Sequence, residues 1–359
     1  MLKLGIEEEF HVVDLATRRV VPSARGLVDR LPIGAFIGDR DTASTIRMVG
    51  SAHHELGDIR GELVALRGIL VQRAAGLHLG ALAGGTAPLL GRDDPAAAES
   101  VGGRHTCGMF VRVEAEDGET ATRAIAWIMP HVSTLLALSA SSPFWAGRDT
   151  GHASWRRHRL EAVAPTPTGG GVGATESARE TLHSPLRLSP HTPMLELRVC
   201  DASADVEVTV AIAAVFRALY RYASRAVVAH RTPPAPSPAI AHRAIRYAAR
   251  FGLAHDLIDP VAAVTRPAAA VVRALVAEMA PYLREADDLD RVETTIERVL
   301  TEGTGAARQR DTARAGDLSA VVDRELARTM ACVVVTDTSP ALDGSPAPDA
   351  PSALDAVVR

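Results

Sequence analysis

Two glutamates, Glu7 and Glu9, stand two positions apart in the segment Leu-Gly-Ile-Glu-Glu-Glu-Phe-His near the start of the chain. Apolar and polar residues alternate there, which predicts a β-strand with both side chains on one face, about 7 Å apart. Carboxylates this close repel each other unless water or a cation separates them, and Mg²⁺ prefers such oxygen ligands. The pattern indicates either the solvated face of an edge strand or part of a metal site. Glu8 then points into the apolar face or sits on a bulge.

A second strand-like segment, Met-Leu-Glu-Leu-Arg-Val-Cys-Asp from residue 194, carries Glu196 and Arg198. Alternation places both on one face and the aliphatic residues on the other. Opposite charges in this arrangement can simply form the salt-bridged face of a sheet. The alternative is a site in which Glu196 binds a metal and Arg198 binds a carboxylate or phosphate through two hydrogen bonds.

The run His53-His54-Glu55 precedes a helix expected to begin near Asp58. Adjacent residues of a strand point to opposite faces, and the chain has no HExxH helix, so the two histidines do not predict zinc. Glu55 is the more attractive candidate, as a further oxygen ligand.

Two polar segments near helix ends are further candidates. Ser139–Gly151 is either ordinary capping and turn chemistry or the lining of a polar pocket, and it lacks the G-x-S-x-G elbow of serine hydrolases. Gly303–Arg310 either stops one helix and starts the next, or brings Arg308 and Arg310 to a phosphate.

The elements that must position these residues are read from hydrophobic periodicity. We expect strands near residues 2–13, 107–114, 184–189 and 194–200, and helices near residues 58–76, 119–140, 205–230, 240–254, 267–283, 287–301 and 316–331. This mixed order predicts an α+β fold with an antiparallel sheet backed by helices. We expect a single domain over residues 1–335, with a flexible loop at 163–177, followed by a disordered tail at 336–359.

Composition limits the class of protein. The 359 residues are 47% hydrophobic and 4% aromatic with a net charge of −4, and no basic stripe with interleaved aromatics predicts nucleic-acid binding. No apolar run approaches the length of a membrane span. The three cysteines, Cys107, Cys200 and Cys332, lack metal-ligand spacing and favour a reducing, cytoplasmic setting. Alanine-rich helices leave room for a homodimer.

Taken in order, these segments resemble the glutamate–cysteine ligase type 2 family of carboxylate–amine ligases, from residue 1 to about residue 335. The matching motifs are Gly5-Ile-Glu-Glu-Glu-Phe10, the Glu55 segment, Ala83-Gly-Gly-Thr86, Cys107-Gly-Met109, Leu138-Ser-Ala-Ser-Ser-Pro-Phe-Trp145, Gly147-Arg-Asp-Thr150, Leu195-Glu-Leu-Arg-Val-Cys-Asp201, Ala248-Ala-Arg-Phe-Gly252 and Gly303 to Arg310.

The resemblance implies a glutamine-synthetase-like fold, with a curved antiparallel sheet as a cradle for ATP and Mg²⁺. It implies a reaction that activates an amino-acid carboxylate as an acyl phosphate, which a small amine then attacks. It also implies roles for individual residues: Glu7, Glu9, Glu55 and Glu196 as metal ligands; Arg198 and Arg112 as catalytic residues; Arg308, Arg310 and Glu196 near the nucleotide; and Phe110, Ser141, Arg148 and Thr150 near the substrate.

The chain departs from the family pattern at three positions. The family usually has His-Val-His-Val-Gly-Val where this chain has Phe110-Val-Arg-Val-Glu-Ala115, and a histidine where it has Ala87. Phenylalanine has no atom that can ligate a metal ion, so Phe110 and Arg112 alter the expected metal set. Three interpretations follow: a ligase with specialised substrates, an ordinary γ-glutamyl ligase with fewer metals, or a non-catalytic relative that binds nucleotide or substrate or serves as a partner subunit.

Overall fold

The computed structural model describes residues 1–31, 35–37, 43–90, 105–163, 184–189, 193–234 and 236–334. Residues 164–177 of the predicted loop and the whole predicted tail, 336–359, lie outside this part of the chain. The division into one domain and a tail therefore remains a prediction.

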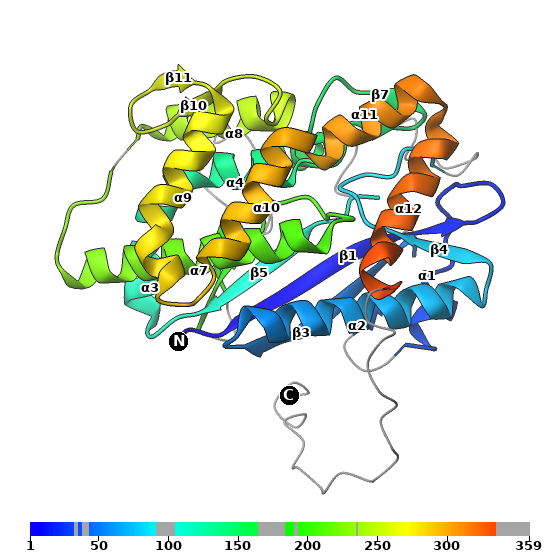
Figure 1. The fold of residues 1–359 in the computed structure, drawn as a ribbon, viewed down its shortest axis with the longest axis horizontal. Coiled ribbons are helices and arrows are strands. Elements are labelled where there is room, and N and C mark those ends of the chain that lie inside the picture. The colour runs from blue at the N-terminus through cyan, green and yellow to red at the C-terminus, as the bar shows by residue number, and fades with distance from the viewer. Residues whose placement is uncertain are drawn as a thin grey trace, which may run out of the picture.

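An antiparallel sheet with the order β2-β3-β1-β5-β9-β8 forms the centre of the fold, and β4 pairs with the far end of β1. The long strand β1 is interior to the sheet, between β3 and β5 (Figure 1). The α+β prediction is therefore confirmed, whereas the edge-strand interpretation of β1 is wrong. The strands of the sheet are β1 (Leu4–Asp14), β2 (Ala35–Ile37), β3 (Thr45–His53), β4 (Leu79–Leu82), β5 (Met109–Glu114), β8 (Leu186–Leu188) and β9 (Met194–Leu197).

Helices cover the apolar face of the sheet. Side chains of α2 (Leu56–Ala75), α3 (Gly118–Ile128) and α7 (Val206–Val228) join Leu4, Ile6 and the apolar residues of β5 in one buried cluster. Two further helices, α9 (Ala268–Arg284) and α10 (Leu289–Glu302), pack on α7 as an outer layer (Figure 1). The remaining described elements are α1 (Ala24–Val28), α4 (Val132–Ser139), α5 (Trp155–Val163), α8 (Pro238–Phe251), α11 (Gly305–Ala315), α12 (Leu318–Val334), the hairpin β6–β7 (Phe144–Trp145, Arg148–Asp149) and the hairpin β10–β11 (Leu257–Asp259, Val264–Arg266).

The helix expected over 119–140 is interrupted. A 3₁₀ turn at Met129–His131 separates α3 from α4. Pro130 lies in that turn and has no backbone N–H to donate, so the α-helical hydrogen bonding stops there.

Glu8 lies on the apolar face, as alternation requires, and is paired there. The Arg67 guanidinium on α2 donates to its two carboxylate oxygens at 2.9 and 2.6 Å, and the Thr209 hydroxyl on α7 donates at 3.1 Å. Glu8 and Arg67 are 3% and 1% exposed. A buried charge needs partners of this kind, so the ion pair explains how a carboxylate is tolerated between sheet and helices.

His11 is fully buried on the opposite face of β1. Its Nε2 lies 3.2 Å from the Gly84 carbonyl oxygen, and its Nδ1 has no hydrogen-bond partner among the described residues. Burial, assisted by the nearby His105, lowers the pKa of His11 to about 3. His11 is therefore neutral in the folded protein at neutral pH.

This lowered pKa predicts acid sensitivity. Below pH 6.5 the unfolded chain gains a proton at His11 that the folded chain does not take up until about pH 3, so this contribution to stability falls as the pH drops through that window. When the pH falls from about 7 to about 4.5, the unfolding free energy of the wild type is expected to drop by about 2–3 kcal/mol more than that of His11→Gln. Urea titrations at both pH values measure the difference. The exposed His255→Gln serves as control, and equal pH dependence in wild type and His11→Gln would contradict the assignment.

No helix among the described residues is long and apolar enough to cross a membrane. Cys107, Cys200 and Cys332 form no disulfide, and the first two are buried.

Candidate active site

The face of the sheet opposite the helices, which we call the open face, carries charged residues from adjacent strands. Strand register places Phe110 of β5 beside Glu7 of β1, and Arg112 of β5 beside Glu196 of β9. The two strand-like segments singled out from the sequence thus meet on one surface, with β5 between them. The predicted facing of Glu7, Glu9 and Glu196 is confirmed by this pairing.

Arginines bind both glutamates that β1 places on this face. The Arg47 guanidinium on β3 donates to Glu9 at 3.1 and 2.7 Å, and the Gly108 backbone N–H donates to the other Glu9 oxygen at 2.9 Å. Glu7 lies 3.2 Å from Arg112 and 3.6 Å from Arg47. The repulsion between neighbouring carboxylates is therefore offset by guanidinium groups of the chain itself.

Glu196 is bound in the same way. Arg187 of the edge strand β8 donates to one of its oxygens at 3.0 and 2.6 Å, and Arg198 donates to the same oxygen at 3.2 Å. Burial, followed by repulsion from Arg187, lowers the pKa of Arg198, so its charge is only partly compensated. The Nε atoms of Arg112 and Arg198 are buried without a hydrogen-bond partner among the described residues.

Phe110 occupies the centre of these arginines. The guanidinium carbons of Arg198, Arg47 and Arg156 lie 4.7, 5.0 and 6.0 Å from its ring centroid. The negative ring face attracts cations, so the phenyl group holds the guanidinium groups side by side without adding a charge. A histidine at this position could have bound a metal, whereas Phe110 binds arginines.

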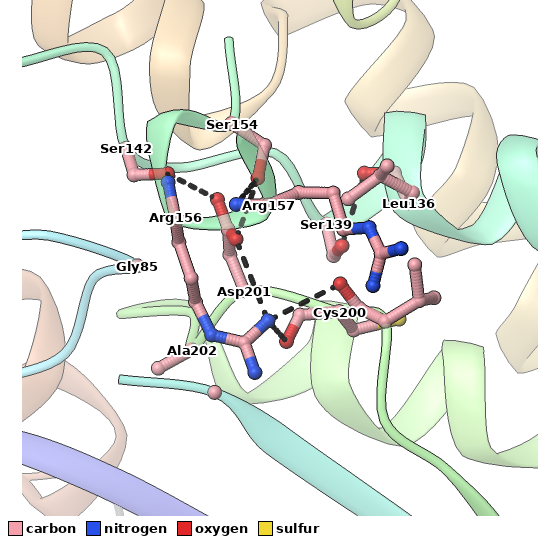
Figure 2. Close-up of polar contacts among 12 residues, drawn as sticks. Gly85, Leu136, Ser139, Ser142, Ser154, Arg156, Arg157, Cys200, Asp201 and Ala202 are labelled. Carbon is pink, nitrogen blue, oxygen red and sulfur yellow. Dashed lines mark hydrogen bonds and ion pairs between the residues drawn. The ribbon is translucent and has the colours of Figure 1, made fainter. Parts of the chain in front are cut away.

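A buried network around Asp201 supports this surface (Figure 2). The hydroxyls of Ser142 and Ser154 donate to Asp201 at 2.6 and 2.8 Å, and the Ser141 backbone N–H donates at 3.0 Å. Arg156 lies 3.9 Å from Asp201 and donates to the Cys200 carbonyl at 2.9 Å. The network holds the segment after β9 against α5, and it positions the Arg156 guanidinium group, whose central carbon lies 6.0 Å from the Phe110 ring centroid.

Glycines permit this close packing. A β-carbon on Gly108 would lie 2.3 Å from an Arg156 nitrogen, and one on Gly85 would lie 2.5 Å from the Asp201 carboxyl carbon. The motifs Cys107-Gly-Met109 and Ala83-Gly-Gly-Thr86 therefore mark positions where backbone approaches the network.

Glu55 does not join the other predicted metal ligands. It is the exposed N-cap residue of α2 and lies near Asp288 at the start of α10, whereas Glu7, Glu9 and Glu196 lie on the open face of the sheet. Only two residues connect the end of β3 to the start of α2, so Glu55 lies beside the helices.

Several predicted substrate and nucleotide residues have other contacts. Ser141 is buried and donates its hydroxyl to the Ala202 carbonyl at 2.6 Å, and the Thr150 hydroxyl donates to Pro143 within the loop at 2.9 Å. Arg148 is exposed in the β6–β7 hairpin. Within the described residues, Ser141 and Thr150 thus have hydrogen-bond partners in the chain itself, and a substrate role for this segment remains a prediction.

Arg308 and Arg310 also point elsewhere. Arg308 donates to the Gly303 carbonyl at 2.7 Å, and Arg310 binds both oxygens of the hairpin residue Asp149 at 2.8 Å. Gly303–Arg310 stops α10 and starts α11, as the simpler interpretation of the sequence had it.

The donor set of the open face does not fit a metal held by protein ligands alone. Among the residues that the structure describes, no group of three or more histidine, cysteine, aspartate or glutamate side chains is placed to hold a metal ion. Each of the three sheet carboxylates already binds an arginine, whose charge repels a divalent cation. Mg²⁺ in phosphoryl-transfer sites typically binds through one or two carboxylates together with substrate phosphates. The arrangement is therefore compatible with Mg²⁺ that binds together with the phosphates of a nucleotide.

Sequence reasoning missed three arginines of the site. Arg47 lies on β3 and Arg156 in the short helix α5, two elements outside the predicted segments, whereas Arg187 lies on the edge strand β8, within the predicted strand 184–189. The sequence shows that these arginines exist, but only the pairing of distant segments in the fold places them beside Glu9, Glu196 and Phe110.

A cavity of about 560 Å³ lies away from the sheet, between α5 and α8. It is lined by His152, His158 and His242 with Arg243, Arg246 and Arg250, and none of the predicted site residues lines it. Burial lowers the pKa of His152 to about 4.

The fold is similar to that of a solved glutamate–cysteine ligase. The chain superimposes on a glutamate–cysteine ligase from Francisella tularensis, solved in complex with AMP, with a TM-score of 0.61, covering 93% of each chain at 11% sequence identity. At that identity the likeness concerns the fold alone.

Sequence comparison defines the family. The model of glutamate–cysteine ligase family 2 matches residues 3–181 and 171–324. A protein from Mycolicibacterium smegmatis, provisionally named glutamate–cysteine ligase 2-2, is 34% identical over 91% of this chain and 89% of its own. A Frankia casuarinae protein of the same provisional name is 34% identical over 92% of this chain, which spans only 42% of that relative's length. The chain belongs to glutamate–cysteine ligase family 2.

Proposed function

We propose that this protein is an ATP-dependent carboxylate–amine ligase, which forms an amide of the γ-glutamyl type. The observation that carries the proposal is the open face of the sheet, where four arginines and three glutamates from adjacent strands converge in a chain of this family. Phosphoryl transfer needs little covalent help from protein; it needs groups that position and neutralise phosphate oxygens. Guanidinium groups supply both.

In the proposed reaction, a substrate carboxylate attacks the γ-phosphorus of ATP, and ADP leaves. The resulting acyl phosphate reacts with an amine, which expels phosphate and loses a proton as the amide forms. ATP enters as its magnesium complex. Arg198 and Arg112 bind the phosphate or the substrate carboxylate, because each retains donor capacity beyond its ion pair.

Phe110 favours specialised substrates. It replaces a polar side chain of the family by an apolar ring at the centre of the site, 4.7 Å from the Arg198 guanidinium. Phe110 is 5% exposed and its ring contacts guanidinium groups, so it acts on the substrate through the arginines that it holds. We propose that the acid carries negatively charged groups spaced to meet these arginines. Such substrates suit a dedicated biosynthetic pathway.

Pair-dependent ADP release tests this function. The protein with ATP and Mg²⁺ is expected to release ADP only when an amino acid, glutamate first, and a small amine such as cysteine are supplied together, and mass spectrometry should detect the amide. Each substrate alone is the control.

Nucleotide binding without pair-dependent ADP release, across a panel of acids and amines, would instead support the second candidate, a non-catalytic relative. The arginine pairing of the predicted metal ligands is the observation that favours this alternative.

A further inference from the structure

The arginines of the open face occupy the region where the family resemblance places metal ions. Arg112 contacts Glu7, Arg47 contacts Glu9, and Arg187 and Arg198 contact Glu196, each at 3.2 Å or less. Metal-holding carboxylates need oxygen lone pairs directed at one point. Here each carboxylate directs an oxygen at a guanidinium group.

Guanidinium groups outnumber carboxylates in these ion pairs. Four guanidinium groups (Arg47, Arg112, Arg187, Arg198) accompany three carboxylates (Glu7, Glu9, Glu196), and the central Phe110 adds no charge. These side chains are mostly shielded from water: Arg198 is 16% and Arg112 22% exposed. Their buried Nε atoms remain unpaired among the described residues. Partly desolvated guanidinium groups with spare donors bind phosphate strongly and by geometry.

We propose that these arginines, and not protein-bound divalent cations, hold the phosphate groups of the ligand, so that this face binds a polyphosphate without metal. The inference rests on the proposed function only for identifying the polyphosphate with the phosphates of ATP. Phe110 and Arg112 are then the residues that change the site from metal-based to arginine-based phosphate binding.

Titration calorimetry with inorganic pyrophosphate tests the proposal. With EDTA present, the full chain is expected to bind pyrophosphate within about threefold of its affinity in Mg²⁺. Arg112→Gln and Arg198→Gln are each expected to weaken binding in EDTA about tenfold or more, because each removes charged hydrogen bonds. Arg284→Gln, at an exposed position at the end of α9, is the matched control and is expected to bind as the wild type does. Circular dichroism checks that each variant is folded.

Two results would overturn the proposal. One is pyrophosphate binding that requires Mg²⁺ and disappears in EDTA. The other is an equal loss of affinity in Arg284→Gln and in the two site variants, which would indicate non-specific attraction.

Manganese binding gives an independent test, which asks whether restoring two histidines creates a metal site that the wild type lacks. Electron paramagnetic resonance of Mn²⁺ with protein alone is expected to show free Mn²⁺ for the wild type. The double variant Phe110→His/Arg112→His is expected to bind Mn²⁺, because it removes one positive charge and places two imidazoles beside Glu7 and Glu196. Equal Mn²⁺ binding by both proteins would contradict the proposal.

The outcomes separate this inference from the proposed function. Pair-dependent ADP release together with strictly Mg²⁺-dependent pyrophosphate binding would leave the ligase standing and remove the inference. Metal-free pyrophosphate binding without pair-dependent ADP release would support the inference and remove the proposed ligase function.

Discussion

Replacing Arg67 by methionine is expected to lower the free energy of unfolding by about 3–5 kcal/mol, because it leaves the Glu8 carboxylate buried without its counter-charge. Arg67 also donates to the backbone carbonyls of Ala204 and Ser203 at 3.0 and 2.8 Å, so the substitution leaves these acceptors unpaired as well. Urea unfolding at neutral pH, followed by circular dichroism, measures the change.

Two controls separate charge from packing. Glu8→Leu/Arg67→Met removes both charges and is expected to recover part of the loss, since apolar groups can replace a buried pair at smaller cost. Arg273→Met removes an exposed ion pair with Glu297 and is expected to leave the unfolding midpoint unchanged. An Arg67→Met protein that loses less than about 1 kcal/mol would show that the buried pair contributes little.

Arg198→Gln is expected to lower the rate of pair-dependent ADP release about 100-fold or more, with the fold intact. Removing one donor that stabilises developing charge typically costs this much in kcat. The reason is local: Arg198 shares one Glu196 oxygen with Arg187, and its buried Nε has no hydrogen-bond partner among the described residues, so it retains a donor for a phosphate. Steady-state kinetics with saturating ATP measure kcat and KM separately.

The lysine variant shows whether geometry matters. Arg198→Lys keeps the charge but loses the planar pair of donors, so only partial recovery is expected. Arg284→Gln again serves as the surface control and should retain full activity. Undiminished kcat in Arg198→Gln would remove Arg198 from the reaction and leave it as a partner of Glu196 alone.

Local patterns predicted part of the sheet: β1, β5, β8 and β9 lie in the expected strand segments, whereas β2, β3 and β4 were not predicted. Alternation in β1 and β9 placed Glu7, Glu9, Glu196 and Arg198 on one face, because side-chain direction in a strand depends only on position. The α+β class followed from the same periodicity. What these patterns could not show is which distant strand pairs with which.

The missing information was therefore long-range. Arg47 and Glu9 are thirty-eight positions apart in the sequence, and Arg67 and Glu8 are fifty-nine apart. Local sequence patterns do not indicate contacts over such separations. Conversely, Arg308 and Arg310 look available in sequence, but Arg308 donates to the Gly303 carbonyl and Arg310 binds Asp149. The buried Nε of Arg308 lacks a hydrogen-bond partner among the described residues. Family resemblance helped with the motifs but misplaced Glu55, whose position depends on how β3 turns into α2.

The charged groups of the open face form a row across the sheet, from Arg187 on β8 through Glu196 and Arg112 to Glu7 on β1. Neighbouring strands lie about 4.8 Å apart, a spacing set by backbone hydrogen bonds. The separations along the row are therefore independent of the lengths of the connecting loops. Insertions in those loops should preserve the site. A one-residue slip of β5 would instead turn Phe110 and Arg112 to the helices and bring Met109, Val111 and Val113 to the ligand.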